Sequence, residues 1–329
     1  MKLSVIIPFY NSEAYLRNCL ESVFLQQLDE KDFEVLLIND GSTDKSVTCV
    51  ADLIDTHANV CLIEQDNQGL SVSRNVGVDR AKGEYILYLD SDDRLLPNAL
   101  HLLVQQADML KPDMVIGNYV KVDDAEFDSF TAEVTDGATR DSAQADSIVK
   151  QWSGEEAFAH FFNPRECYVW RMLFKRSFLD KHSIRFVPHL YFEDIIYTVK
   201  CYLKCETCVT VNQLFYAYRT RQGSICSTMN MRKVYDINTS IKHLWQMREE
   251  APVERLLPLQ EAIFVTFSVN VWYMTHDKSL IPHTSDFIRD IRAKVPRLEF
   301  HNSKMQRLVS FLFRYFPQLF LYLKTHIIP

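Results

Sequence analysis

Apolar and polar residues alternate along the first 122 positions in a pattern that predicts strands and helices in turn. The expected strands are short apolar runs at residues 3–7, 33–38, 60–63 and 85–89. The expected helices, with apolar residues at helical spacing, cover residues 16–28, 47–54 and 70–81. Regular alternation of this kind is typical of a doubly wound, mostly parallel α/β sheet.

Carboxylates follow two of these expected strands. Asp90, Asp92 and Asp93 come at the end of the fourth strand, and Asp40 follows the second. Sheets of this type bind ligands beyond the carboxyl ends of their strands. Closely spaced carboxylates repel one another, and Mg²⁺ or Mn²⁺ would relieve that repulsion. A solvated turn before a helix near Pro97 would explain the cluster alone, but its convergence with Asp40 favours a binding site.

Composition sets limits on the class of protein. The chain has 329 residues, of which 47% are hydrophobic, enough for one large or two modest domains. No run of about 18 uncharged apolar residues predicts a spanning helix, and the N-terminus lacks a signal-peptide profile. The eight cysteines are scattered, which favours a cytoplasmic protein. Cys201, Cys205 and Cys208 lack a fourth ligand at finger-like spacing, so we expect them to pack in the core.

Charge is distributed unevenly. The net charge of −7 divides into −11 for residues 1–125, −1 for residues 126–230 and +5 for residues 231–329. The acidic first part argues against nucleic-acid binding and fits a site that needs a cation. The first strand is followed by Pro8 to Ser12. Neither a dinucleotide-binding glycine turn nor a Walker loop is present, so carboxylates and a cation would have to hold any nucleotide.

Four motifs stand in a fixed order within the first hundred residues: Ser4 to Asn11, Ile38 to Asp44, Asn67 to Gly77, and Asp90 to Asp93. Together they resemble the motifs of the family 2 inverting glycosyltransferases, which have the GT-A fold. The resemblance continues more weakly through Val169 to Arg176 and Phe192 to Asp194, and it fades beyond about residue 230. It implies sugar transfer from a UDP-sugar, with Mg²⁺ or Mn²⁺ as cofactor.

The resemblance also implies a role for individual residues. Asp40 would accept a hydrogen bond from uracil N3–H, a pairing that suits a carboxylate because it offers only acceptors. Asp92 would hold the metal, and Asp93 would share that task or cap the following helix. Arg74 would contact the pyrophosphate, or only orient Asp90. The implied nucleotide-sugar site consists of Pro8, Tyr10, Asp40, Arg74, Asp90, Ser91, Trp170 and Arg221.

Inversion requires a general base, and in this family the base is usually the aspartate of a Glu-Asp pair. That pair matches Glu193 and Asp194, with Asp194 preferred and Glu193 as the second choice. Both could instead be acidic residues that favour a helix N-terminus. Trp170 would stack on a sugar or be buried in the core. Many relatives carry a lysine where this chain has Met172, so any polar contact made there is absent.

Three further segments carry expectations, and two of them have two interpretations each. Residues 122–153 read as a variable excursion of the kind that often carries acceptor specificity. The segment from Arg219 to Ser224 resembles a loop that closes over the donor diphosphate through Arg221, or is a solvated turn. Residues 301–329 carry four Lys/Arg and no acid among many aromatic residues and leucines. An interfacial helix on anionic lipid at the inner membrane face explains this as well as internal packing or a dimer contact.

We therefore predict a GT-A-like, mostly parallel α/β domain with a C-terminal helical extension. Residues 1–122 would bind the nucleotide sugar, residues 123–230 the acceptor, and residues 231–329 would form the extension. The activity expected is metal-dependent hexosyl or N-acetylhexosaminyl transfer to a saccharide, lipid-linked or free, in bacterial-type surface polysaccharide synthesis. A catalytically inactive sugar-binding or scaffold relative, and a nucleotidyltransferase, are the alternatives.

Overall fold

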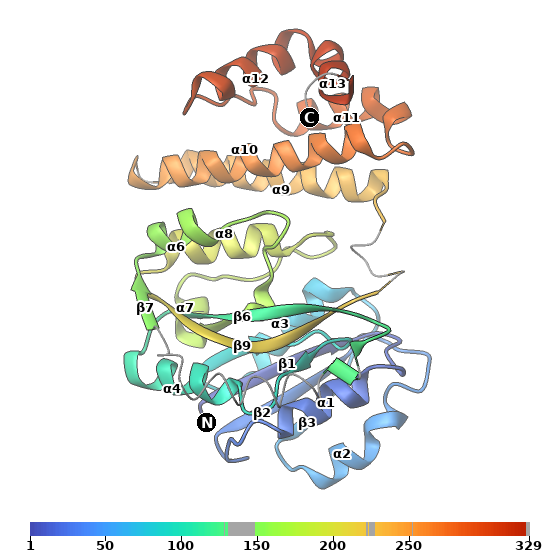
Figure 1. Cartoon of the computed structure of the whole chain (residues 1–329), viewed down its shortest axis with the longest axis vertical. Helices are drawn as coiled ribbons and strands as arrows, with labels where there is room; N and C mark the ends of the chain where they lie inside the picture. The colour runs from blue at the N-terminus through green and yellow to red at the C-terminus, as the bar shows by residue number, and fades with distance from the viewer. Residues whose placement is uncertain (128, 131–148, 222, 224–227, 252, 327–329) are drawn as a thin grey trace. The chain divides into compact units, whose positions relative to one another are not determined.

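A computed structural model describes residues 1–127, 129–130, 149–221, 223, 228–251 and 253–326 of the chain (Figure 1). The chain divides into two compact units, which are described separately. Unit 1 comprises residues 1–154, 168–189 and 204–224, and unit 2 comprises residues 155–167, 190–203 and 225–329. The functional division at residues 122 and 230 stays a prediction.

Unit 1 contains the sheet and the helices that cover it. Its first half consists of β1 (Leu3–Phe9), α1 (Leu16–Phe24), β2 (Phe33–Asn39), η1 (Thr48–Val50), α2 (Ala51–Thr56), β3 (Val60–Glu64), α3 (Leu70–Arg80), β4 (Tyr85–Tyr88), β5 (Arg94–Leu95) and α4 (Leu100–Leu110). Its second half consists of β6 (Met114–Asp123), β7 (Val149–Trp152), η2 (Val169–Arg171), β8 (Met172–Lys175), α7 (Arg176–Lys181) and β9 (Cys208–Thr220).

The strands form one sheet in the order β3-β2-β1-β4-β8-β6-β9-β5, with β7 paired to β9. Strands β1 to β4 are mutually parallel, and β6 is parallel to β9. Strand β8 is antiparallel to both β4 and β6 and joins the two parallel groups. The predicted α/β sheet is therefore confirmed. Because β1, β2 and β4 are parallel, the residues that follow them come together at one edge.

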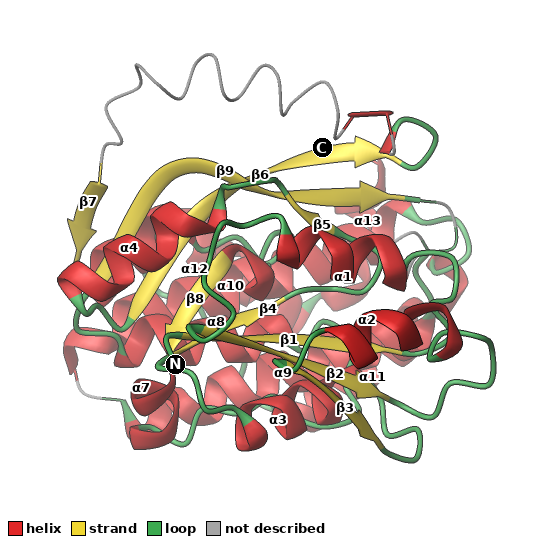
Figure 2. Cartoon of the chain, turned by 90° about the horizontal axis from the view of Figure 1, so that it is seen from below, coloured by secondary structure: helices red, strands yellow, loops and turns green. Residues whose placement is uncertain are grey.

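The two faces of the sheet are covered by different helices (Figure 2). Leu3, Val5 and Ile7 of β1 share a buried apolar cluster with residues of α1 and α4. Ile6 points to the other face, where α3 approaches so closely that a Cβ on Gly77 would lie 2.3 Å from Ile6 Cγ2. Alternate residues of a strand face opposite sides, so each central strand is buried on both.

Some boundaries differ from those expected from sequence. Strand β1 continues through Pro8, which pairs with Ile38, because the proline lacks only its own N–H and the next carbonyl still accepts a hydrogen bond from Asp40 N–H. Residues 208–220 form one long strand, β9, which joins two short apolar runs of the sequence at residues 209–211 and 214–218. The pairing of β9 with β6 shifts register between Ile116 and Tyr119, and the extra residues lie in β9, between Thr210 and Tyr216.

Unit 2 is helical in its described part. It holds α6 (Gly154–Phe161), α8 (Asp194–Lys204), α9 (Met231–Glu250), α10 (Val253–His276), η3 (Ile281–His283), α11 (Thr284–Lys294), α12 (Lys304–Tyr315) and α13 (Pro317–His326), apart from the end residues Gly154 and Lys204. The helical C-terminal extension is thus confirmed. Among the described residues, no helix combines the length and apolarity needed to cross a bilayer.

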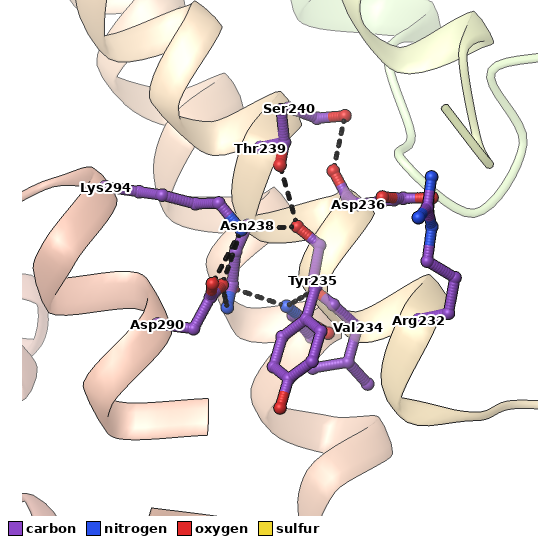
Figure 3. A network of polar contacts seen from close by, with 10 residues as sticks. Arg232, Val234, Tyr235, Asp236, Asn238, Thr239, Ser240, Asp290 and Lys294 are labelled. Carbon is purple, nitrogen blue, oxygen red and sulfur yellow. Dashed lines mark hydrogen bonds and ion pairs between the residues drawn. The ribbon is translucent and has the colours of Figure 1, made fainter. Parts of the chain in front are cut away.

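A buried polar network links three of these helices (Figure 3). Asn270 Nδ2 of α10 donates to Asn238 Oδ1 of α9 at 2.8 Å, and Asn238 Nδ2 donates to Asp290 Oδ2 of α11 at 2.9 Å. Lys294 Nζ donates to both oxygens of Asp290. Because Asn238 and Asn270 are fully buried and hydrogen bonds are directional, this network fixes the register of α9, α10 and α11.

Candidate active site

Asp40 follows β2 and anchors the turn that opens α3. Its Oδ1 accepts hydrogen bonds from Gln65 Nε2 at 2.7 Å and from the Gln68 backbone N–H at 2.9 Å, and Oδ2 accepts from the Gly69 N–H at 2.8 Å. Gly69 has a φ of 87°, a backbone conformation that favours glycine. A carboxylate has about four lone-pair sites, so one acceptor position remains at Oδ2. A contact with uracil stays a prediction.

Arg74 of α3 is paired with Asp90 at the end of β4. Arg74 Nη2 donates to Asp90 Oδ1 at 2.8 Å, and the arginine side chain is only 2% exposed. The rings of Phe186 and Tyr88 lie 5.2 and 5.9 Å from the guanidinium carbon. The structure therefore gives Arg74 the contact that orients Asp90, while its part in binding pyrophosphate stays a prediction.

Asp93 ties the acidic turn to β9. The hydroxyl of Tyr216 donates to Asp93 Oδ2 at 2.7 Å, and the Arg219 backbone N–H donates to Oδ1 at 2.8 Å. Burial, followed by the charges of Asp92 and Asp90, raises the pKa of Asp93 well above its usual range. Asp93 does not cap α4, whose N-cap residue has no side-chain hydrogen bond. One of the two roles expected for it is therefore wrong.

Asp92 lies beside two arginines at the end of β9: Arg219 within the strand and Arg221 just after it. Arg221 Nε donates to Asp92 Oδ2 at 2.9 Å, and Arg219 Nε donates to the Asp92 carbonyl oxygen at 2.9 Å. The ring of Tyr15 packs against both guanidinium groups, at 4.9 and 5.1 Å. The segment expected to close over the diphosphate thus begins in contact with the acidic turn. Gln222 and Ser224 of that segment lie outside the described residues.

The acidic turn fits a divalent cation. Burial, followed by the charge of Asp90, raises the pKa of Asp92 above its usual value, so the ionised form is disfavoured there and a cation would stabilise it. Asp90 and Asp92 both remain partly exposed. Within the described part of the chain, no three His, Cys, Asp or Glu residues form a group that could hold a metal. Mg²⁺ or Mn²⁺ needs only one or two carboxylates when substrate phosphates supply further ligands, so Asp92 with Asp90 suffices.

The loop after β1 reaches the same edge. Ser91 Oγ and Ser12 Oγ are 2.9 Å apart, which connects the acidic turn to this loop. Pro8 is buried within β1, whereas Tyr10 is half-exposed just beyond the strand. The structure thus brings Tyr10, Ser91 and Asp92 to one side of the sheet, and the contacts expected of them with a nucleotide sugar stay predictions.

Trp170 is surrounded by aromatic side chains. Tyr216, Tyr168 and Tyr218 stack with its ring at centroid distances of 4.2, 4.6 and 5.3 Å, and Tyr119 packs edge-on at 5.0 Å. Its exposure is 2%, which leaves no open ring face for a sugar in this structure. Of the two interpretations left open by the sequence, this packing supports the core tryptophan.

Glu193 and Asp194 lie in unit 2, at the start of α8. Asp194 is the first residue of the helix, and its carbonyl oxygen accepts a hydrogen bond from Thr198 Oγ1 at 2.7 Å. The two residues follow a turn in which His189 and Phe192 both have positive φ, at 61° and 58°. Strain of this kind is often found at functional sites. A helix N-terminus also favours acidic residues, so the role of Asp194 as base stays a prediction.

Several residues of the site could not be recognised from their motifs. Tyr216 and Arg219 lie about 125 positions from the acidic turn that they contact. Tyr15 and Gln65 lie outside the four sequence motifs. The sequence signal in this region is the pair Arg219 and Arg221, which predicts a contact for Arg221 and none for Tyr216.

The sheet order and the likeness to solved structures show the GT-A fold. The chain belongs to glycosyl transferase family 2, whose family model matches residues 4–182. It is 30% identical over 231 residues to glycosyltransferase GlyA of Streptococcus pneumoniae, covering 68% of this chain and 31% of GlyA. For glycosyltransferase GlyG of the same organism the identity is 30%, covering 69% of this chain and 73% of GlyG.

The putative glycosyltransferase EpsH of Bacillus subtilis is also 30% identical, over 68% of this chain and 62% of EpsH. The chain therefore spans less than two thirds of GlyA and EpsH. Among solved structures, residues 1–349 of S. aureus TarS in complex with UDP-GlcNAc match with a TM-score of 0.68 and 21% identity, over 95% of this chain and 87% of that one. Mannosyltransferase PcManGT from Pyrobaculum calidifontis, with GDP-Man and Mn²⁺, matches with a TM-score of 0.58 and 17% identity, over 98% of this chain and 85% of that one.

Proposed function

We propose that this chain is an inverting, metal-dependent glycosyltransferase. It transfers a hexosyl or N-acetylhexosaminyl group from a UDP-sugar to a saccharide, lipid-linked or free, in surface polysaccharide synthesis. The observation that carries the proposal is the convergence of Asp40, Asp90 and Asp92 beyond parallel strands of one sheet, with Arg221 in contact with the last of them. TarS, which has the same fold, was solved with UDP-GlcNAc, and this supports a uridine donor.

Different residues bind the nucleoside, the cation and the diphosphate of the donor. Asp40 accepts from uracil N3–H through its remaining acceptor position, and Tyr10 lies against the base or ribose. Asp92, with Asp90, holds Mg²⁺ or Mn²⁺, which when bound stabilises negative charge on the leaving diphosphate. Arg221 exchanges its contact with Asp92 for the diphosphate, since a guanidinium pairs equally well with carboxylate and phosphate oxygens.

Transfer with inversion needs a base on the acceptor side. Asp194 removes the proton from the acceptor hydroxyl as that oxygen attacks the anomeric carbon, and the bond to the UDP oxygen breaks on the opposite face. The proton stays on the carboxylate until the products leave. Glu193 is the second candidate for this role. Its buried position suits a residue that supports Asp194.

The test is cation-dependent release of UDP from a panel of UDP-sugars, with the anomeric configuration of the product determined by NMR. Asp194→Asn should lower turnover by about 10²–10⁴-fold and leave UDP affinity unchanged, because general-base assistance is of that size. Glu193→Gln is the matched control, with a smaller loss. An equal loss of UDP affinity in Asp194→Asn would make Asp194 a structural residue.

Asp92→Asn tests the metal site, and the product released by the wild-type protein separates this proposal from its alternatives. The substitution should weaken UDP binding when Mn²⁺ is present and change it little in EDTA. An inactive sugar-binding relative would release no UDP from any donor. A nucleotidyltransferase would release pyrophosphate from a nucleoside triphosphate instead. Either result, in protein that binds UDP, would refute the proposed reaction.

A further inference from the structure

Helix α12 of unit 2 has two apolar faces, and only one of them is packed. Phe313 is buried against Phe267 of α10 and Phe320 of α13, at centroid distances of 4.9 and 5.9 Å. Leu308, Phe311 and Tyr315 are spaced three and four residues apart, so they share a face on successive turns. All three side chains are more than half exposed. A helix that only packs internally would carry polar residues there.

The exposed face continues along α13, which lies next to α12 (Figure 1). Phe320 and Leu321 of α13 are buried, while neighbouring apolar side chains are exposed. The exposed apolar surface of the two helices consists of Met305, Leu308, Phe311, Tyr315, Phe316, Leu319 and Tyr322, each between 48% and 65% exposed. We call this set the exposed α12–α13 surface. Seven large apolar side chains within eighteen residues form a concentration that marks an interaction site.

Basic side chains border this surface. Lys304 and Arg307 are exposed on α12, and residues 301–329 contain no Asp or Glu. A shallow pocket of about 270 Å³ beside the surface is lined by His301, Arg307, Arg314, Phe311, Tyr315, Phe300, Ser310 and Glu299. Glu299 is the one acid in that lining, and it is paired with Arg314. A second pocket adds Arg292 and Arg297 next to Arg314.

Charge decides between the two occupants that such a surface could accept. A second copy of the chain would place the same basic border opposite itself, and like charges across an interface oppose association. An anionic bilayer offers apolar depth for the aromatic and leucine side chains, together with phosphate groups for the arginines. The partner that complements both features is the lipid surface.

We propose that the exposed α12–α13 surface docks the protein onto an anionic membrane, with the arginine-lined pocket facing the lipid phosphates. The contact is peripheral and reversible, since α12 with 12 residues and α13 with 10 residues are each too short to span a bilayer. This inference goes beyond the proposed reaction and does not depend on its donor or base.

The test is co-sedimentation of the full chain with vesicles of phosphatidylcholine, with and without phosphatidylglycerol, in the absence of substrate. Wild-type protein should pellet with the anionic vesicles, less so at high salt, and little with the neutral ones. Leu308→Gln/Phe311→Gln should abolish pelleting, since both side chains are solvent-exposed and their loss leaves the core intact. Lys304→Gln/Arg307→Gln should lower the partition coefficient by roughly 30-fold, at about fivefold for each basic residue.

The matched control is Met109→Gln/Leu110→Gln, which replaces two exposed apolar residues of α4 in unit 1 and should leave pelleting unchanged. Sedimentation velocity without lipid provides the second measurement. Equal pelleting of wild type and the Leu308/Phe311 variant would overturn the proposal, as would a dimer that this variant dissociates. Cation-dependent UDP release should be the same in all three variants, so failure here is distinguishable from failure of the proposed reaction.

Discussion

Asp90 and Asp92 should respond differently to the same substitution by asparagine. Each accepts a hydrogen bond from an arginine at nearly the same distance, 2.8 Å for Arg74 and 2.9 Å for Arg221. The partners differ in exposure, since Arg74 is 2% exposed and Arg221 is 28% exposed. Asp90→Asn therefore removes a charged acceptor from a buried guanidinium, whereas Asp92→Asn removes one from a guanidinium that water can reach.

Removing one partner of a buried ion pair typically costs 3–5 kcal/mol, and the partial exposure of Asp90 favours the lower end, about 3 kcal/mol. With an m-value of about 2–3 kcal/mol/M, the urea midpoint should fall by about 1–1.5 M. For Asp92→Asn we expect a change within about 1 kcal/mol, as for exposed pairs. The free energy of unfolding should rise, because burial and the charge of Asp90 already raise the pKa of Asp92. A neutral asparagine removes the repulsion between the two carboxylates.

The assay is urea unfolding in EDTA, followed by tryptophan fluorescence and far-UV circular dichroism. The double variant Asp90→Asn/Arg74→Met should recover most of the stability lost in the single variant, because it removes both charges of this ion pair together. Equal losses at Asp90 and Asp92, or no recovery in the double variant, would refute the claim that burial of the arginine decides the outcome.

Three further predictions concern other parts of the fold. Gly77→Ala should lower stability by about 1–3 kcal/mol in thermal melting, because the new Cβ would overlap buried Ile6; an unchanged melting temperature would contradict the packing. Asp40→Asn should speed hydrogen exchange at the Gly69 amide and weaken UDP binding, and exchange at the wild-type rate would show that the turn does not need the carboxylate. Burial, with two nearby lysines, lowers the pKa of His243 below 6.5. Its neutral form therefore contributes stability above pH 6.5 that is lost as the pH falls, and His243→Gln should show less acid destabilisation in pH-dependent melting; identical pH profiles would exclude this.

Much of unit 1 could be predicted from the sequence because local patterns define its elements. The apolar runs placed β1 to β4 within one or two residues, and Gly69 marked the start of α3. The order of strands and helices also implied that Asp40 and Asp90 would meet at one edge, since parallel strands end on the same side of a sheet. Charge and aromatic content in residues 301–329 likewise indicated an amphipathic segment, before any contact of α12 or α13 was visible.

The contacts that complete the site depend on pairings that local sequence does not encode. Tyr216 and Arg219 reach Asp93 only because β9 pairs with β6 and β5 at the far side of the sheet. Whether Trp170 faces a ligand or the core is decided by Tyr119, Tyr216 and Tyr218, which come from two distant segments. The chemistry of the Asp90 to Asp93 turn was determined by residue type and order. The burial of Arg74, the exposure of Arg221 and the unpacked face of α12 follow from long-range packing, which sets how far water reaches each group and so how much each charge is worth.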